Sequence, residues 1–378
     1  MHTSDIVVVG AGLVGSALAW GLSRLDQKVT ILDEGDQTLR ASRGNFGLVW
    51  VQGKGAGLSD YARWSLRSAT QWPELASALT AQTGVDVALQ QKGGLSLALS
   101  EDDLQSKVKN LEWLRGEVGA PYDFEVLDNK ALKELVPSIG PTIPGATYSP
   151  MDGHVNPLKL FLALHRAMHH QGVSLHSNAA VERIERKDGL FICHTAAGKF
   201  AAKKVVLAAG LANKKLAQHV DIHAPVEPNR GQVLITERLP AFLNFPTNYV
   251  RQTDEGTVQL GDSLEDVGYN DGTTTPVLQN IAQRAVRCFP ILANTRVVRS
   301  WAALRIMSPD GFPIYQESSS MPGAFLVTCH SGVTLAANHA LTLAPWIAGD
   351  QKPEAIQAFT ANRFNAARTS PLGEEHAH

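Results

Sequence analysis

The chain opens with three glycines whose spacing is typical of dinucleotide-binding proteins. Gly10, Gly12 and Gly15 directly follow the β-branched run at residues 6–9. In this arrangement Gly10 permits a tight turn, Gly12 lets the backbone approach a pyrophosphate, and Gly15 lets a helix pack on a strand. The helix that follows would present free N–H groups and a partial positive charge to phosphates. The sequence therefore predicts a βαβ unit that binds a dinucleotide.

An acidic pair follows at the distance that such a site requires. Asp33 and Glu34 come about 20 residues after the first glycine, at the end of a second predicted strand, 28–32. A carboxylate at this place binds ribose hydroxyls. A flavin disulfide reductase would carry a second GxGxxG motif for NAD(P)H in mid-chain, and the sequence has none. This absence argues against a second site for NAD(P)H, and at this point the dinucleotide can be either FAD or NAD.

A second glycine-rich segment, residues 53–57, follows a predicted strand at 48–52. It lacks the third glycine of the motif, and no strand and acid follow about 20 residues later. It is therefore not expected to bind a nucleotide. Two interpretations remain open, a flexible loop and a mobile lid over the substrate.

Length and composition restrict the class of protein. A chain of 378 residues predicts about two domains, and its formal net charge of −2 gives no basic excess for nucleic acid or an anionic membrane. Cys193, Cys288 and Cys329 are too few and too far apart for a disulfide framework or a CxxC pair, which suits the cytoplasm. No stretch approaches the ~20 apolar residues of a membrane span, and the run at 6–9 is too short for an export signal. No His, Asp or Glu spacing indicates a metal site.

The predicted elements place nucleotide-type segments in three separate parts of the chain. The opening unit is followed by strands between residues 174 and 208, and then by a strand at 325–329 with a helix at 332–349. Strand-rich inserts lie between them, and a helix that begins at 59 or 60 is expected to end before Pro73. We expect 1–47, 151–222 and 323–378 to form an FAD-binding domain, and 48–150 and 223–322 to form a substrate domain.

Further motifs follow in order along the chain, at 40–47 (RASRGNFG), 152–157 (DGHVNP), 205–210 (VVLAAG), 299–305 (RSWAALR), 309–313 (PDGFP) and 330–336 (HSGVTLA). Together they resemble the FAD-dependent D-amino acid oxidase superfamily, which includes glycine oxidase, sarcosine oxidase and the β-subunits of bacterial opine and hydroxyproline dehydrogenases. The last motif is most similar to the last of these groups. The resemblance implies an α/β fold, with a Rossmann-like FAD-binding domain assembled from separated segments and an α+β substrate domain with a large antiparallel sheet. It also implies hydride transfer from a carbon that bears nitrogen to flavin N5, giving an imine that water hydrolyses.

The resemblance assigns residues to the cofactor. The segment 42–48 should border the diphosphate and isoalloxazine, and Val181 should contact the adenine side through its backbone. The segment 332–334 should cap the pyrimidine end, where backbone N–H groups stabilise negative charge on the reduced flavin. The predicted cofactor-binding residues are Gly10, Gly12, Leu13, Val14, Gly15, Asp33, Glu34, Arg40, Ser42, Arg43, Asn45, Phe46, Gly47, Leu48, Val181, Ala209, Gly210, Ser331, Gly332, Val333 and Thr334.

The resemblance also nominates residues for the substrate. Arg305 should pair with a substrate carboxylate, which suits the bidentate geometry of a guanidinium group. Tyr249 is expected to hydrogen-bond the carboxylate and Arg251 to add positive charge, although a structural role fits each of them equally. His330 is either a proton acceptor or a packed histidine that holds the last loop.

Two departures from the sarcosine oxidases bear on the chemistry. Thr334 stands where those enzymes carry a lysine that promotes reaction with oxygen, and Arg305 stands where they attach FAD through a cysteine. We therefore expect non-covalent FAD and leave open whether oxygen, a quinone or a partner protein accepts the electrons.

The leading hypothesis is an enzyme that oxidises the C–N bond of a small amino acid, which is a D-, secondary or N-substituted one. The alternatives are a 2-hydroxy acid oxidoreductase on the same fold, and a flavin-bearing subunit that is active only in a hetero-oligomeric amine dehydrogenase. Homo- and hetero-oligomers both remain open.

Overall fold

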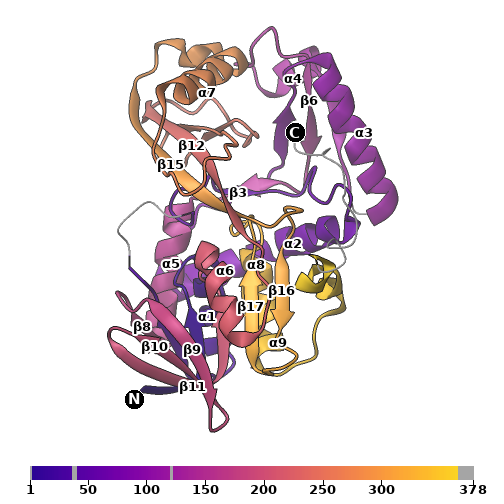
Figure 1. Cartoon of the computed structure of the whole chain (residues 1–378). Coiled ribbons are helices and arrows are strands. Elements are labelled where there is room, and N and C mark those ends of the chain that lie inside the picture. Colours follow the sequence, from indigo (N-terminus) through magenta and orange to yellow (C-terminus); the bar gives the residue numbers. More distant parts are fainter. Residues whose placement is uncertain (1, 36–40, 120–121, 365–378) are drawn as a thin grey trace.

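The computed structural model describes residues 2–35, 41–119 and 122–364. One half of the molecule, the lower half in Figure 1, is built on an eight-stranded sheet. Its parallel strands in spatial order are β8 (Ser174–His176), β2 (Val29–Leu32), β1 (His2–Val9), β11 (Gly198–Leu207) and β17 (Ala324–Thr328), and β16 (Ile314–Glu317) is antiparallel at the edge. A hairpin of β9 (Val181–Lys187) and β10 (Leu190–Thr195) pairs with the first part of β11. Strands β2 and β17 are completely buried, as expected for parallel strands that are covered on both faces.

Helices from the start, middle and end of the chain cover this sheet. Helix α1 (Leu13–Ser23) packs on α5 (Pro157–His170) and on a C-terminal helical run. That run consists of α8 (Ala336–Asn338), a π-helical turn (His339–Leu343) and α9 (Ala344–Ala348). A Cβ atom on Gly21 would lie 2.2 Å from the carbonyl oxygen of Ala340, so glycine permits the close approach of the two helices.

The other half of the molecule, uppermost in Figure 1, contains two antiparallel sheets. The first is ordered β13 (Val250–Gln252), β14 (Thr257–Leu260), β12 (Glu227–Arg238), β15 (Val297–Met307), and the second β4 (Gly94–Leu97), β6 (Gly145–Ser149), β5 (Glu125–Asp128). The helices of this half are α3 (Glu101–Val118), α4 (Asn129–Leu135) and α7 (Thr275–Cys288). An isolated bridge between Leu95 and Thr247 joins the sheets. We expected one large antiparallel sheet, and the structure has two sheets joined by this bridge. The predicted α/β fold class is confirmed.

Short elements complete the described chain. The two-residue strands β3 (Leu48–Val49) and β7 (Gly153–His154) pair with each other where the two halves meet. The remaining helical elements are η1 (Gly210–Ala212), α6 (Asn213–Leu216), η2 (Ala217–Val220), η3 (Pro290–Asn294), η5 (Glu354–Phe359) and η6 (Ala361–Phe364).

The prediction that a helix would end before Pro73 is wrong, because α2 runs from Ser59 to Thr83. Proline has no N–H, so the carbonyl of Ala69, one turn earlier, loses its helical donor. The side-chain amide of Gln91 donates to that carbonyl at 2.8 Å. A tertiary contact thus replaces the missing helical bond and lets the helix continue.

The predicted strand at 48–52 is also shorter than expected, since only Leu48 and Val49 pair with another strand. The backbone N–H groups of Val51 and Gln52 instead donate to the buried carboxylate of Asp152, at 2.5 and 3.3 Å. A side chain has taken the place of a neighbouring strand. The division into two domains stays a proposal, because α2, in the segment assigned to the substrate domain, packs on α5 and α8 of the other.

Candidate cofactor and substrate site

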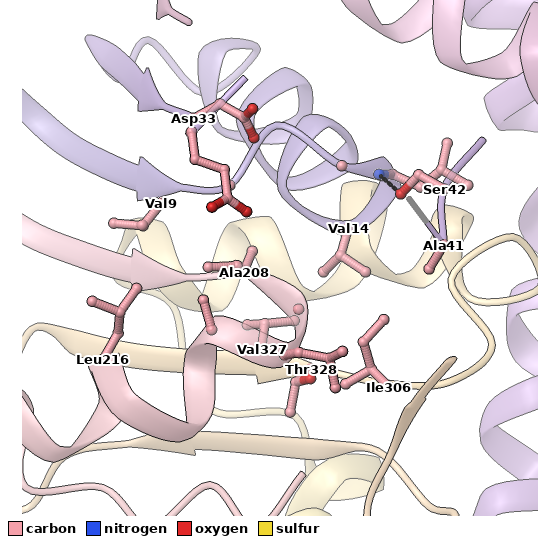
Figure 2. A pocket seen from close by; sticks show the side chains of 18 of the residues that line it. Val9, Val14, Asp33, Ala41, Ser42, Ala208, Leu216, Ile306, Val327 and Thr328 are labelled. Atoms are coloured by element: carbon pink, nitrogen blue, oxygen red, sulfur yellow. Dashed lines mark hydrogen bonds between the residues drawn. The ribbon is translucent and has the colours of Figure 1, made fainter. Parts of the chain in front are cut away.

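A cavity of about 240 Å³ lies at the carboxyl ends of the central parallel strands (Figure 2). We call it the first cavity. The ends of β1, β2, β11 and β17 contribute Val9, Leu32, Ala208 and Val327 to its wall. The crevice beyond the carboxyl ends of parallel strands is where open α/β sheets bind their ligands.

The glycine motif shapes one wall of this cavity. A Cβ atom on Gly15 would lie 1.9 Å from the carbonyl oxygen of Gly10, so glycine there permits the helix to pack on the turn. A Cβ atom on Gly12 would lie 2.8 Å from Oγ of Ser42. That hydroxyl accepts a hydrogen bond from the N–H of Leu13 at 2.9 Å, as Figure 2 shows. The start of α1 therefore offers its free N–H groups and an unobstructed backbone to the cavity.

Asp33 leaves β2 toward the same cavity and closes the nucleotide-binding turn (Figure 2). One carboxylate oxygen accepts from the N–H of Ala11 at 2.7 Å, and the other accepts from the N–H of Gly35 at 2.8 Å. Glu34 also lines the cavity. Each Asp33 oxygen keeps acceptor capacity beyond these bonds, which is what hydroxyl groups of a ribose require.

A second cavity of about 210 Å³ is lined in part by Ala41, which also lines the first cavity. Much of its wall is apolar, and its ionisable groups are Lys54, Asp262, Arg305 and His330. The described residues that line it are Ala41, Gly44, Asn45, Phe46, Leu48, Trp50, Lys54, Gly231, Val233, Asp262, Ala303, Arg305, His330, Ser331, Val333 and Thr334. A mostly apolar cavity with a few polar groups is the usual form of a small-molecule site.

Arg305 lines this second cavity, and it already has a protein partner. Its Nη2 donates to the carboxylate of Asp262 at 2.5 Å and its Nη1 donates to the carbonyl of Ser263 at 2.8 Å. The guanidinium lies against the backbone of Gly231, where a Cβ atom would be 2.4 Å from Nη2. The Asp262 side chain is 44% exposed, so an anion that enters the cavity can compete with it.

Lys54 also lines the second cavity, although nothing in the sequence selects it beyond its being the one charged residue of the loop 53–57. Its Nζ donates to Oγ of Ser331 at 2.5 Å. The hydroxyl of Tyr61 bonds the same Oγ at 3.0 Å, and Nζ lies 5.6 Å from the centre of the Tyr61 ring. These contacts hold the ammonium group beside the last loop.

His330 lines the second cavity and is exposed to the space inside it. Desolvation by the surrounding walls, together with the positive charges of Lys54 and Arg305, lowers the pKa of His330 to about 3. The imidazole is therefore neutral near pH 7. It can accept a hydrogen bond, but it holds a proton weakly, which disfavours the role of proton acceptor.

Arg251 and Tyr249 line neither cavity. Arg251 is buried and donates to the carbonyl of Val155 at 3.1 Å and to Oε1 of Gln259 at 2.7 Å. Burial lowers its pKa to about 10, which leaves it charged near pH 7. The ring of Tyr249 lies under the guanidinium of Arg284, whose Cζ is 4.4 Å from the ring centre. Arg251 thus joins β13 to the segment that precedes α5, and the described contacts of both residues are with other protein groups.

The structure brings most of the predicted cofactor residues together. Those that line the first cavity are Gly10, Gly12, Leu13, Val14, Asp33, Glu34, Ser42, Val181, Ala209 and Gly210. Those that line the second are Asn45, Phe46, Leu48, Ser331, Val333 and Thr334. Gly15, Arg43, Gly47 and Gly332 line neither cavity, and Arg40 lies outside the described residues. Sequence reasoning missed Trp50, Lys54 and Asp262.

A glycine turn that opens onto one cavity, an acid at the end of the next strand and an adjoining cavity with a few ionisable groups define a dinucleotide-binding protein with a second small-molecule site. The family model for FAD dependent oxidoreductases, DAO, matches residues 5–346, and the chain belongs to this family. FAD is accordingly the dinucleotide. The residues fit it, because Gly12 leaves the backbone bare where α1 begins beside the first cavity and Asp33 lines the same cavity.

Several relatives resemble nearly the whole chain. An opine oxidase subunit of Agrobacterium tumefaciens (strain Ach5) is 45% identical over 367 residues, which cover 97% of this chain and 99% of that protein. Glycine oxidase of Geobacillus kaustophilus is 27% identical over 335 residues, 87% of this chain and 88% of that protein. The crystal structure of glycine oxidase from Geobacillus kaustophilus superimposes with a TM-score of 0.89 at 24% identity, covering 95% of this chain and 98% of that one. The chain shares its fold with that structure.

Two kinds of feature are absent from the residues that the structure describes. None of the described helices is long and apolar enough to cross a membrane. The described part of the chain also holds no group of three His, Cys, Asp or Glu residues placed to bind a metal ion.

Proposed function

We propose that this chain oxidises the C–N bond of a small amino acid, D-, secondary or N-substituted, with non-covalently bound FAD. The observation that carries the proposal is the position of Arg305 in a cavity that adjoins the FAD cavity. The names of the relatives, an opine oxidase subunit and glycine oxidase, support it. When bound, FAD supplies a hydride acceptor for the carbon that bears nitrogen, and water hydrolyses the imine product.

Within this proposal Arg305 orients the substrate by its carboxylate. The guanidinium has two parallel donors that match a carboxylate, and the substrate carboxylate would replace that of Asp262 on Nη2. Trp50 and Val333 line the same cavity and would exclude water from the reacting carbon. Neutral His330 would accept a hydrogen bond from the substrate nitrogen.

The cofactor assignments that the sequence suggested fit the same proposal. Asp33 would bind ribose hydroxyls, and the N–H groups of the segment 332–334 would face the pyrimidine end of the flavin. The hydroxyl of Thr334 donates to the carbonyl of Leu48 and accepts from the N–H of Trp50, both at 3.2 Å. Thr334 therefore links two loops and carries no charge itself. We propose a quinone or a partner protein as the electron acceptor, because this position lacks the lysine of the sarcosine oxidases.

The test is anaerobic mixing of the FAD-loaded protein with a panel of amino acids, because only a true substrate bleaches the flavin. Arg305→Met should weaken binding of the best substrate at least tenfold while FAD stays bound. The control is Arg299→Met, an exposed arginine on the same strand, which should bind as the wild type does. Unchanged carboxylate affinity in Arg305→Met would overturn the assignment, and bleaching by 2-hydroxy acids alone would replace the proposed reaction.

A second candidate is a flavin-bearing subunit that is active only in a hetero-oligomer. The relative at 45% identity is named as a subunit, as is hydrogen cyanide synthase subunit HcnC of Pseudomonas protegens (strain DSM 19095 / LMG 27888 / CFBP 6595 / CHA0), at 28% identity. Under this proposal the purified chain holds FAD that no amine reduces, and added partner chains restore reduction. The three cysteines are buried and unpaired, which supports a cytoplasmic location.

A further inference from the structure

The glycine-rich loop 53–57 has no part in the function described so far, yet it carries Lys54 into the second cavity. We propose that Lys54 is a second carboxylate-binding residue and holds the acidic end of the substrate together with Arg305. This inference rests on the proposed function, since it concerns the substrate of the same site. It gives the loop a role that neither of its two earlier interpretations supplied.

The charges of the cavity carry the first step of the argument. Arg305 and Asp262 form an ion pair at 2.5 Å, so their charges offset each other. His330 is uncharged near pH 7 because its pKa is lowered to about 3. Among the described residues of the wall, only Lys54 then remains as a charge without a counter-charge.

The contacts of Lys54 carry the second step. An ammonium group has three donors, and Nζ uses one of them on the neutral hydroxyl of Ser331. No carboxylate of the described residues lies within ion-pair distance of this lysine. The charge of Asp152 acts on Lys54 only from beyond ion-pair distance. A half-buried cation with no carboxylate in contact favours an anion in the adjoining space. Since the cavity is of small-molecule size, that anion is a carboxylate of the substrate.

The base of the loop is built to hold this lysine in place. The carboxylate of Asp152 accepts from the N–H of Val51 and, at 2.6 Å, from the side-chain amide of Gln52. Oε1 of Gln52 in turn accepts from the hydroxyl of Thr147 at 2.7 Å. All three polar side chains are buried, so the backbone directly before Lys54 is held in one position.

Glycine on both sides of Lys54 completes the turn. Gly53 and Gly55 have φ values of +75° and +90°, in the left-handed region. A Cβ atom on Gly55 would lie 2.6 Å from the backbone nitrogen of Ala62, so the loop rests directly on the first turn of α2. The N–H of Lys54 donates to the carbonyl of Val51 at 3.1 Å. The geometry directs one side chain of the loop inward.

The test is Lys54→Met in the FAD-loaded protein, because methionine keeps an unbranched apolar chain and removes the charge. Acetate is the probe, and its dissociation constant is measured from the change in the flavin absorption spectrum and by calorimetry. We expect acetate to bind at least tenfold more weakly, while binding of neutral acetamide is unchanged. Lys54→Arg should restore most of the affinity. The control, Lys203→Met, removes a lysine whose side chain is 75% exposed and should change nothing.

Acetate affinity in Lys54→Met equal to that of the wild type would overturn the inference. If this variant holds no FAD, calorimetry of acetate with the wild-type and Lys54→Gln apoproteins gives the same decision. A failure of the proposed function gives a different result. In that case no amino acid would bleach the flavin, although the affinity for acetate would still depend on Lys54. If amino acids do bleach the flavin, Lys54→Met should raise the substrate concentration for half-maximal reduction more than it lowers the limiting rate.

Discussion

Gly12 lies where α1 begins beside the first cavity. Replacing it with alanine can weaken FAD binding in two ways, by displacing Ser42 and by obstructing the pyrophosphate. The new Cβ atom would lie 2.8 Å from Oγ of Ser42, closer than such contacts normally come. Ser42 must then rotate, and its hydroxyl loses the bond from the N–H of Leu13. A net hydrogen bond contributes about 1 kcal/mol, which corresponds to about a fivefold change in affinity.

The larger effect should come from the cofactor itself. The methyl group stands where the backbone must approach the pyrophosphate, and we expect it to cost at least about a further 1.4 kcal/mol, or tenfold. Gly12→Ala should therefore bind FAD about 50-fold more weakly or worse. The apoprotein should still fold, because the only close contact of the new atom is with one small side chain.

The assay is titration of apoprotein with FAD, followed by the quenching of flavin fluorescence. Ser42→Gly serves as the control for the lost hydroxyl and should weaken binding about fivefold. The double variant Gly12→Ala/Ser42→Gly removes the internal clash and keeps the methyl group. If that double variant bound FAD as well as Ser42→Gly does, the obstruction would lie within the protein, and the assignment of Gly12 to the pyrophosphate would be refuted.

Two further predictions concern stability. Burial raises the pKa of Asp152 to about 7 from 3.8, so the protonated side chain stabilises the fold below about pH 4 and this contribution is lost as the pH rises to about 7. The Tm of the wild type should therefore fall relative to that of Asp152→Asn between pH 4 and 8. Parallel Tm profiles for the two proteins would contradict this. Gln91→Ala should lower the free energy of unfolding by about 1 kcal/mol, because the carbonyl of Ala69 loses its donor. Lys92→Ala, an exposed neighbour, is the control in denaturant unfolding, and equal midpoints for the two variants would count against the role given to Gln91.

The cofactor half was predictable because its signals are local. The turn at Gly10, the start of α1 and the acid at Asp33 lie within one βαβ unit, and short-range sterics decide each of them. The same holds for fold class, since the order of elements along the chain indicates which strands are parallel. The motif at 299–305 likewise selected Arg305, which lines the second cavity.

The sequence could not predict hydrogen-bond and ion-pair partners that come from distant segments of the chain. Asp262 follows β14 and Arg305 lies on β15, and the two meet only because these strands flank β12 in the same sheet. Asp152 accepts the backbone hydrogen bonds of residues 51–52 in place of a neighbouring strand, and Gln91 donates to the carbonyl that Pro73 leaves without a helical donor. Neither contact is visible as a pattern of neighbouring residues in the sequence. Resemblance placed Tyr249 and Arg251 near the substrate. Their side chains instead contact Arg284 and Val155 and line neither cavity, because a motif does not specify the direction of a side chain.

The order of strands in the central sheet has a consequence for how the protein is made. As the nascent chain leaves the ribosome, β1 and β2 emerge early, but β11, the other neighbour of β1, follows only after residue 198, and β17 follows only after residue 324. The walls of the first cavity are therefore incomplete until nearly the whole chain has been synthesised. Pairings this far apart in sequence form slowly, because long loops must close first. We therefore expect FAD to bind only after the last strand of the sheet has been made, which would make cofactor loading a late step of biosynthesis.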